Sequence, residues 1–325
     1  MSHKIFTYTI IILPMRVFRF FAVLTFFLFV IAGLTFSASA SDLWVVDTRQ
    51  TDCPPAKSLE TLDFTQLEFK CLQENETTYK WETSTAEKFI ETFEPEKPLI
   101  VIVHGNWMSY REIFPFAYRF KQLAMRNVKD ADCRIVFWSW RSDRTNLNVR
   151  KDALLKSQRA YTEARILASC LLHLPKNSKV SLAGFSFGAG LICRSLQLLA
   201  EYERAGSPSM PQLQLRAVLL AAAMDQSSLL PNRKYGNALG ILDSMLIHVN
   251  TADDTLCWYP LLVGIGGPKA IGKEGVFTGG LSAQNRSKIT SKNVAGVIGH
   301  EHGFMDSLRA LLAVQGDFRK YCLFE

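Results

Sequence analysis

The sequence lacks the residue patterns that identify several classes of protein. Its seven cysteines include no C-x-x-C pair and no other spacing typical of metal ligands, and the H-E-x-x-H pattern of zinc proteases is absent. No basic block is interleaved with aromatic residues, as is typical of nucleic-acid binding. We therefore expect no metal, no cofactor and no nucleic-acid partner.

The sequence also lacks internal repeats, low-complexity linkers and any apolar run beyond residue 40 that could span a membrane. Its 325 residues, of which 48% are hydrophobic, are enough to bury a sizeable core. The net charge of +7 includes three basic residues and no acid from the first 40 residues, which leaves +4 for the rest. These properties predict one large, mildly basic domain over residues 41–325.

The first 40 residues have the pattern of an export signal. Arg16 and Arg19 precede an uncharged apolar run over residues 20–34, and small residues follow and end in Ala-x-Ala at Ala40. This order predicts a signal peptide that is cleaved after Ala40. The alternative is an uncleaved N-terminal anchor, through which the protein would associate with a membrane. In both cases we expect residues 41–325 outside the cytoplasm, either periplasmic or secreted, or held at the membrane.

The number of cysteines is odd, so at least one of them is unpaired. Cys53 and Cys71 flank a short N-terminal excursion and are the first pair to test for a disulfide in an oxidising compartment. Four others lie in apolar patterns and are expected to be buried thiols: Cys133, Cys170, Cys193 and Cys257.

Strand and helix patterns alternate along residues 41–325. The expected strands are residues 43–48, 67–72, 99–103, 134–138, 180–183, 215–221, 245–250 and 288–295, the first two of them antiparallel. The expected helices are residues 85–93, 111–127, 149–173 and 190–202. Continuous Val, Ile and Leu runs are typical of strands covered by helices on both faces. The sequence thus predicts an α/β fold with a mostly parallel central sheet of about eight strands, helices on both faces and no large cap domain.

A pentapeptide of the form G-x-S-x-G, Gly184 to Gly188, lies between a predicted strand and a predicted helix. In this context it is typical of a nucleophile elbow, a tight turn that exposes a serine hydroxyl, here that of Ser186. Glycine is expected at both ends because side chains there would collide with the adjoining strand and helix. An ordinary strand-to-helix turn is the alternative interpretation.

A serine hydroxyl becomes a good nucleophile only when a base removes its proton. In the chain order Ser, acid, His that accompanies such an elbow, the base comes last. Of the six histidines, only His300 and His302 lie late in the chain, just before an apolar helix. We choose His302, which adjoins Gly303 at the helix entry, and keep His300 in reserve. His248 lies inside an apolar strand and is expected to be a core residue.

The orienting carboxylate should follow one of the late strands. Asp253 comes directly after the strand at residues 245–250 and is the first choice, with Asp254 next to it. Asp225 follows the preceding strand and is a third candidate. The sequence leaves all three aspartates open.

Two backbone N–H groups are needed to hold an oxyanion. One is expected from Phe187, the residue after the serine. The other should come from the loop His104-Gly105-Asn106-Trp107, which follows the most hydrophobic strand of the protein. Within that loop Asn106 is the first choice and Trp107 the second.

The GFSFG elbow, the HGN loop, the late acid and the GHEHGF histidine segment together resemble the α/β-hydrolase family. The resemblance covers nearly all of residues 41–325. The sequences Trp138-Ser139-Trp140 and AVLLAAAMD at residues 217–225 are similar to signal-bearing bacterial members of that family that have no assigned substrate.

The resemblance implies a serine hydrolase with the triad Ser186, Asp253 and His302. The expected reaction is hydrolysis of a small-molecule or lipid carboxylic ester through an acyl-enzyme, while peptides, amides and thioesters stay open as substrates. Two alternative functions are a membrane-surface lipase and a non-catalytic binding protein that retains the fold.

Overall fold

The computed structural model describes residues 42–51, 59–74, 78–206, 211–263, 266–314 and 316–325. Residues 1–40 and Cys53 lie outside the described residues, so the leader and the Cys53–Cys71 disulfide stay predictions. Within the described ranges, no helix is both long and apolar enough to cross a bilayer.

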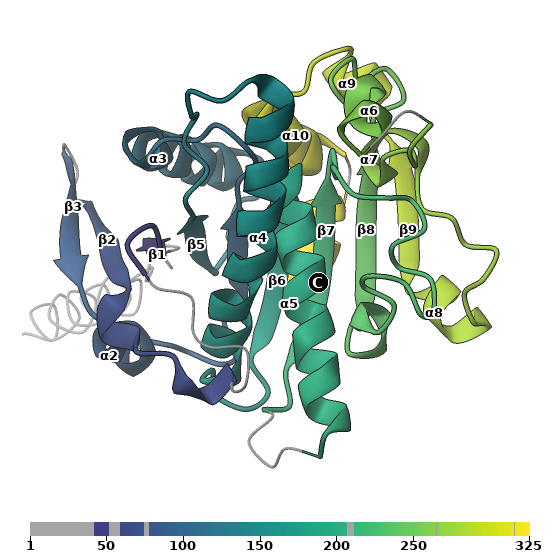
Figure 1. Ribbon diagram of the computed structural model, residues 1–325. Coiled ribbons are helices and arrows are strands. Elements are labelled where there is room, and N and C mark those ends of the chain that lie inside the picture. Colours follow the sequence, from purple (N-terminus) through teal and green to yellow (C-terminus); the bar gives the residue numbers. More distant parts are fainter. Residues whose placement is uncertain (1–41, 52–58, 75–77, 207–210, 264–265, 315) are drawn as a thin grey trace, which may run out of the picture. The chain divides into compact units, whose positions relative to one another are not determined.

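A mostly parallel sheet forms the centre of the fold (Figure 1). Among the described residues its nine strands are β1 (Asp42–Asp47), β2 (Glu68–Glu74), β3 (Tyr79–Ser84), β4 (Leu99–Val103), β5 (Arg134–Ser139), β6 (Lys179–Phe185), β7 (Gln214–Leu220), β8 (Ser244–Val249) and β9 (Ile289–Asn293). They are ordered β3-β2-β1-β5-β4-β6-β7-β8-β9. The pairs β1–β2 and β2–β3 are antiparallel, and every other pair is parallel.

Helices cover both faces of this sheet, with α4 and α5 on one face and α3 and α10 on the other (Figure 1). The helices are α2 (Ala86–Glu91), α3 (Tyr110–Asn127), α4 (Val149–Leu172), α5 (Phe187–Arg204), α6 (Tyr259–Val263), α7 (Ile271–Glu274), α8 (Ala283–Ser287), α9 (Ala295–Ile298) and α10 (Phe304–Ala313). Short 3₁₀ turns include η3 (Ala238–Gly240) and η4 (Leu256–Trp258). The predicted fold class is therefore confirmed.

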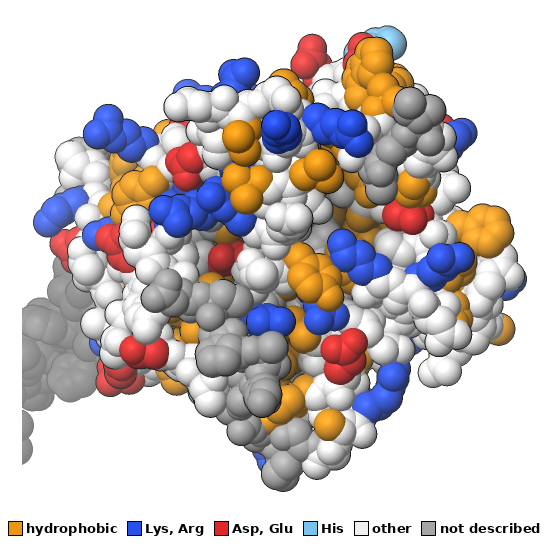
Figure 2. Space-filling view, viewed as in Figure 1, with side chains coloured by type: hydrophobic (Ala, Val, Ile, Leu, Met, Phe, Trp, Pro, Cys, Tyr) orange, Lys and Arg blue, Asp and Glu red, His pale blue; other side chains and the backbone are white. Residues whose placement is uncertain are grey.

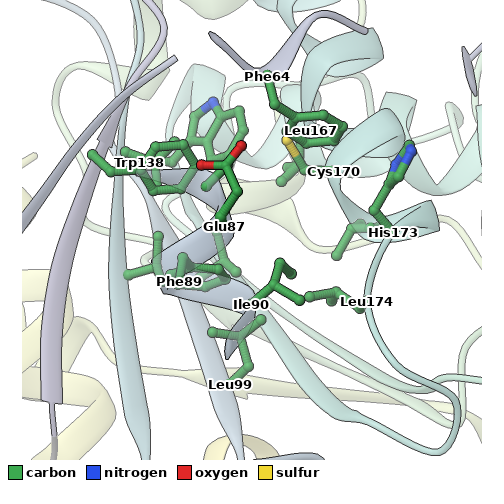
Figure 3. Close-up of a pocket in the computed structure, with 16 residues that line it drawn as sticks. Phe64, Glu87, Phe89, Ile90, Leu99, Trp138, Leu167, Cys170, His173 and Leu174 are labelled. Carbon is green, nitrogen blue, oxygen red and sulfur yellow. The ribbon is translucent and has the colours of Figure 1, made fainter. Parts of the chain in front are cut away.

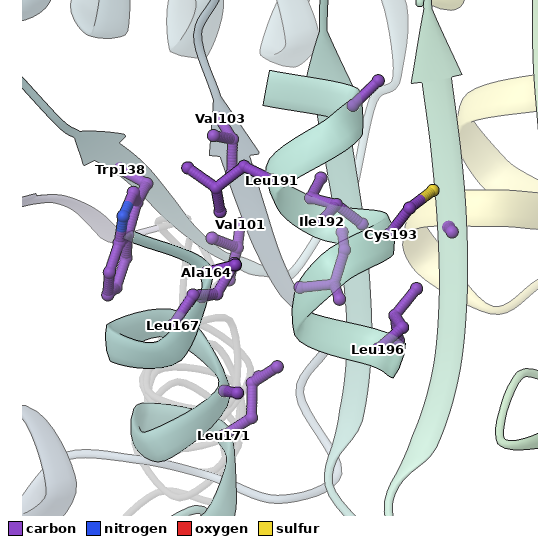
Figure 4. Packing of buried hydrophobic residues seen from close by; sticks show 14 of the residues in the cluster. Val101, Val103, Trp138, Ala164, Leu167, Leu171, Leu191, Ile192, Cys193 and Leu196 are labelled. Carbon is purple, nitrogen blue, oxygen red and sulfur yellow. The ribbon is translucent and has the colours of Figure 1, made fainter. Parts of the chain in front are cut away.

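Each buried strand contributes side chains to two hydrophobic cores, because successive side chains of a strand point to opposite faces of the sheet. In β4, Leu99, Val101 and Val103 belong to the core beneath α4 and α5, whereas Ile100 and Ile102 belong to the core beneath α3 and α10. Figure 4 shows the first of these cores, where side chains of α4 and α5 lie against those of β4 and β5. A strand buried on both faces thus needs the continuous apolar run that the sequence contains.

The structure differs from the sequence-based expectation in two details of the fold. It adds the edge strand Tyr79–Ser84, whose residues are mostly exposed and therefore lack the apolar pattern of a buried strand. Cys133 and Cys193 are buried as expected, but Cys170 is only half-buried. Cys257 is exposed, because it lies on the short surface turn η4.

The carboxyl ends of the central strands meet at one edge of the sheet. Val103 at the end of β4 pairs with Gly184 near the end of β6. Phe185 pairs with Leu220 of β7, which in turn pairs with His248 of β8. The loops that follow β4, β6, β7 and β8 therefore lie side by side, as expected for an open α/β sheet.

A buried charged cluster links the end of β1 to β5. Arg49 Nε lies 3.3 Å from Asp47 Oδ1 and donates a hydrogen bond of 2.9 Å to Ser139 Oγ. Ser139 Oγ in turn donates to Asp47 Oδ1 at 2.5 Å. Burial raises the pKa of Asp47 to about 6, against the opposing effects of Ser139 and Arg49.

Glu163 of α4 lies in the same buried region. Its carboxyl accepts hydrogen bonds from Thr48 Oγ1 and from Trp138 Nε1, the latter at 3.3 Å. Burial raises the pKa of Glu163 to about 7. The folded protein therefore holds a proton on this carboxyl at pH values where the unfolded chain has released it.

Glu163→Gln should flatten the dependence of stability on pH. Between pH 4.5, the ordinary pKa, and about 7, the folded state binds more protons at Glu163 than the unfolded state, so raising the pH lowers the free energy of unfolding. The neutral amide of glutamine removes this contribution. Urea unfolding at pH 5 and pH 8 measures it, with the exposed Glu203→Gln as the control that keeps the wild-type slope. Equal pH slopes for the two variants would contradict the prediction.

Candidate active site

Ser186 lies in a tight turn between β6 and α5. Its backbone has φ 53°, the left-handed region that a non-glycine residue adopts only when its surroundings impose it. Here Ser186 N donates to Leu220 O at 3.0 Å, and Ser186 O accepts from Ala223 N at 3.2 Å. These bonds to the last residue of β7 and to the segment after it hold the turn and present the hydroxyl at the edge of the sheet.

The two glycines of the elbow are required by close packing, as the sequence predicts. A Cβ atom on Gly184 would lie 2.7 Å from the backbone of Ala189, and one on Gly188 would overlap the carbonyl oxygen of Val103. Real Cβ atoms do not approach backbone that closely. Helix α5 can therefore begin directly against β4 and β6 only with glycine at both positions.

His302 connects Ser186 to Asp253. His302 Nε2 lies 3.1 Å from Ser186 Oγ, and His302 Nδ1 lies 2.7 Å from Asp253 Oδ2. A carboxylate can only accept, so it places the proton of the neutral ring on Nδ1 and leaves Nε2 as an acceptor for the serine hydroxyl. The structure thus brings together the three side chains predicted as the triad.

Asp253 is held rigidly below the surface. It is 0% exposed, and its second oxygen, Oδ1, accepts the N–H of Leu256 at 2.8 Å. The loop that carries it is tied to the histidine loop by Asn250, whose Nδ2 donates to Gly299 O at 2.8 Å. The turn after β8 therefore fixes the acid and the base relative to each other.

The alternative acids and the reserve histidine lie elsewhere. Asp254 and His300 form their own contact of 3.4 Å, with side chains that are 74% and 76% exposed. Asp225 Oδ1 accepts from the N–H and the hydroxyl of Ser227, at 2.7 and 2.9 Å. His248 is buried as expected, and its Nε2 lies 3.0 Å from Asp317 Oδ2. Of the three aspartates, Asp253 is the one bonded to His302.

The loop after β4 lies beside the elbow, as the oxyanion prediction requires. Asn106 lines a cavity together with Ser186 and Phe187. Phe187 is the first residue of α5, where a backbone N–H has no partner within the helix. Trp107 N instead donates to Ser142 O at 2.9 Å, which makes this second choice unsuited to the role. The assignment of Asn106 and Phe187 as the two oxyanion donors stays a prediction, and both residues line the cavity at Ser186.

A buried histidine supports this loop. His104 is 0% exposed, and burial lowers its pKa to about 3, so its ring is neutral. His104 Nδ1 lies 2.9 Å from Gly105 O, and its Nε2 accepts the N–H of Trp140 at 3.3 Å. Trp140 Nε1 donates to His104 O at 2.9 Å. Trp140, the last residue of the Trp-Ser-Trp element, therefore holds the loop in place through two hydrogen bonds to His104.

Two polar residues that the sequence analysis did not single out complete this support. Ser142 Oγ accepts from Met108 N at 3.2 Å, so it holds the far side of the loop. Asp152 of α4 accepts from the indole of Trp107 at 2.5 Å and pairs with the buried Lys156 at 3.0 Å. A single serine or aspartate in a polar segment gives no sequence signal for such a contact.

The cavity above Ser186 has a volume of about 590 Å³. Its lining is mostly apolar and includes Val149, Leu256, Trp258 and Leu262, with His302 on one side. A separate apolar cavity of about 360 Å³ lies between α2 and α4, among residues such as Phe89, Leu167 and Leu174 (Figure 3). This cavity between α2 and α4 is lined by none of the triad residues.

No family model and no curated protein matches the chain. Among solved structures, it is similar to a protein described as a cell surface hydrolase from Lactobacillus plantarum WCFS1, with 12% identity, a TM-score of 0.36, and coverage of 71% of this chain and 94% of that one. It is also similar to a promiscuous dienelactone hydrolase-like phosphotriesterase from metagenomic libraries, with 16% identity, a TM-score of 0.37, and coverage of 79% and 93%. A third is esterase B from Lactobacillus rhamnosis, with 12% identity, a TM-score of 0.33, and coverage of 79% and 77%. All three TM-scores are below 0.5, so these similarities assign no function to the chain.

Proposed function

We propose that the protein is a serine hydrolase that cleaves carboxylic esters through an acyl-enzyme on Ser186. The observation that carries this proposal is the hydrogen-bonded row from Ser186 through His302 to the fully buried Asp253. A nucleophile, a base within reach of its proton and a carboxylate that orients the base are the parts that acyl transfer needs.

In the acylation step, Ser186 Oγ attacks the acyl carbon while its proton passes to His302 Nε2. The carbonyl π electrons move onto the carbonyl oxygen, and this oxyanion accepts hydrogen bonds from the N–H groups of Phe187 and Asn106. Collapse of the intermediate breaks the bond to the alcohol, which takes the proton from His302 Nε2. Water then repeats the sequence on the acyl-enzyme and releases the acid.

Asp253 acts by keeping the Nδ1 proton of His302 in place and by stabilising the imidazolium that forms. Because the carboxylate is buried and its other oxygen is bonded to Leu256 N, it has little freedom to turn away. The mostly apolar cavity next to Ser186 would hold an acyl chain.

We include export in the proposal, because the first 40 residues have the pattern of a signal peptide or anchor.

Ser186→Ala should lower the hydrolysis of p-nitrophenyl butyrate by roughly 10⁴-fold or more, because the attacking group is gone. The same variant should no longer react with a fluorophosphonate probe. Ser287→Ala, which changes an exposed serine on α8, is the matched control and should keep both activities. Turnover by Ser186→Ala at the wild-type rate would refute the proposal, and a wild-type protein that neither reacts with the probe nor turns over any ester would favour a binding protein.

Asp253→Asn should lower kcat by about 10³–10⁴-fold with little change in the fold, because the asparagine amide favours the wrong tautomer of His302. Asp254→Asn is the control, since its side chain is 74% exposed and contacts His300 instead. Steady-state kinetics on the same ester compare the two variants. A larger loss in Asp254→Asn would assign the acid to Asp254.

A membrane-surface lipase is the second candidate, favoured by a rim of exposed apolar side chains at the cavity. Trp107, Val149 and Trp258 line it and are 44%, 56% and 66% exposed. A lipase should hydrolyse emulsified long-chain esters faster than dissolved short-chain esters. We expect the opposite order, and comparing p-nitrophenyl butyrate with emulsified triolein at matched ester concentration decides between the two.

A further inference from the structure

A second, more polar pocket adjoins the cavity above Ser186. It has a volume of about 440 Å³ and shares three lining residues with that cavity: Phe187, Ala223 and Tyr259. Phe187 follows Ser186 in the chain, and Ala223 N bonds to Ser186 O. A substrate bound at Ser186 therefore lies directly beside this pocket.

Cationic side chains from two separate segments meet at this polar pocket beside the cavity above Ser186. Arg233 and Lys234, from the segment between β7 and η3, line it. Lys234 Nζ lies 5.1 Å from the centre of the Tyr161 ring, and the guanidinium of Arg194 on α5 lies 4.5 Å from the same ring. Figure 2 shows lysine and arginine side chains among hydrophobic ones on the face that carries α4 and α5.

These charges are poorly neutralised by the protein. Neither Arg233 nor Lys234 forms an ion pair with a carboxylate among the residues that the structure describes. Arg194 forms an ion pair with Glu201 at 3.7 Å, and its buried Nε has no hydrogen-bond partner among the described residues. Among the described residues, Asp225 is the one carboxylate that lines the pocket. Its Oδ1 accepts two hydrogen bonds, one from the N–H and one from the hydroxyl of Ser227. Desolvation and the neighbouring Arg194 lower the pKa of Lys234, as expected where like charges gather.

We propose that this pocket binds an anionic group of the substrate, so that the preferred esters carry a carboxylate or a phosphate in addition to the ester bond. Lys234 and Arg233 would donate to the anion, and the Tyr161 ring would hold the two cations Lys234 and Arg194 against its face. This inference rests on the proposed function, since it assigns a substrate class to the same catalytic serine. An apolar cavity for the ester beside a cationic pocket for the anion fits a short ester with one anionic group.

The kinetic test compares two esters that differ in one charge. One is the p-nitrophenyl monoester of adipic acid, with a free carboxylate, and the other is its methyl-capped diester. The wild-type kcat/KM should be at least about 10-fold higher for the charged ester, the usual scale of one charged hydrogen bond. Lys234→Met should remove most of this preference and keep turnover of the capped ester. Lys176→Met, at an exposed lysine outside both pockets, removes the same charge and should keep the preference.

A binding measurement keeps the inference separate from the proposed function. Isothermal titration of monomethyl adipate and of butyl phosphate onto the Ser186→Ala variant needs no turnover, and the two ligands distinguish carboxylate from phosphate. Saturable binding of either one that Lys234→Met abolishes would support the anion pocket. No binding of either ligand, or Ser186-dependent hydrolysis without preference for the charged ester, would overturn it and leave the serine hydrolase proposal standing. Loss of the proposed function would instead show as ester turnover that does not depend on Ser186.

Discussion

The site depends on one constraint, the forced backbone conformation of Ser186. A residue with a side chain in the left-handed region costs about 1–3 kcal/mol, so neighbouring structure must impose it. Two backbone hydrogen bonds, one to the end of β7 and one to the segment after it, do so, together with the glycines that let α5 pack against β4 and β6. If strand β6 continued without that turn, the hydroxyl of Ser186 would lie in the core, out of reach of His302. The geometry of the candidate site is thus a property of strand packing as much as of the three side chains themselves.

The loop after β4 is fixed by a different means, a small polar network buried behind it. His104 is neutral because burial lowers its pKa, and a neutral ring can donate at Nδ1 while it accepts at Nε2. A charged imidazole could not accept the N–H of Trp140. Burial therefore sets the protonation state, and the protonation state makes the bonds that hold Asn106 beside Ser186. The same logic orients His302, where a carboxylate rather than burial selects the tautomer.

Much of the fold and part of the site could be predicted from the sequence. The strand Leu99–Val103 was predicted with its observed bounds, because a strand buried on both faces must be apolar throughout. The edge strand Tyr79–Ser84 could not be, since it is mostly exposed. The sequence favoured Asp253 over Asp254 but left both open, and only folding buries one and exposes the other. The cationic pocket was missed because Arg194 and Lys234 are brought together by the packing of distant segments.

The exposed Trp258 has a further consequence. Trp258 is 66% exposed and lines the cavity above Ser186, as the less exposed Trp107 also does, whereas Trp138 and Trp140 are buried in the protein. Emission from a wet indole is shifted to longer wavelength and is open to collisional quenchers, while buried indoles are shielded. A molecule that enters the cavity covers part of Trp258 and changes its surroundings. The mouth of the site thus carries its own optical reporter of occupancy, and no dye needs to be attached.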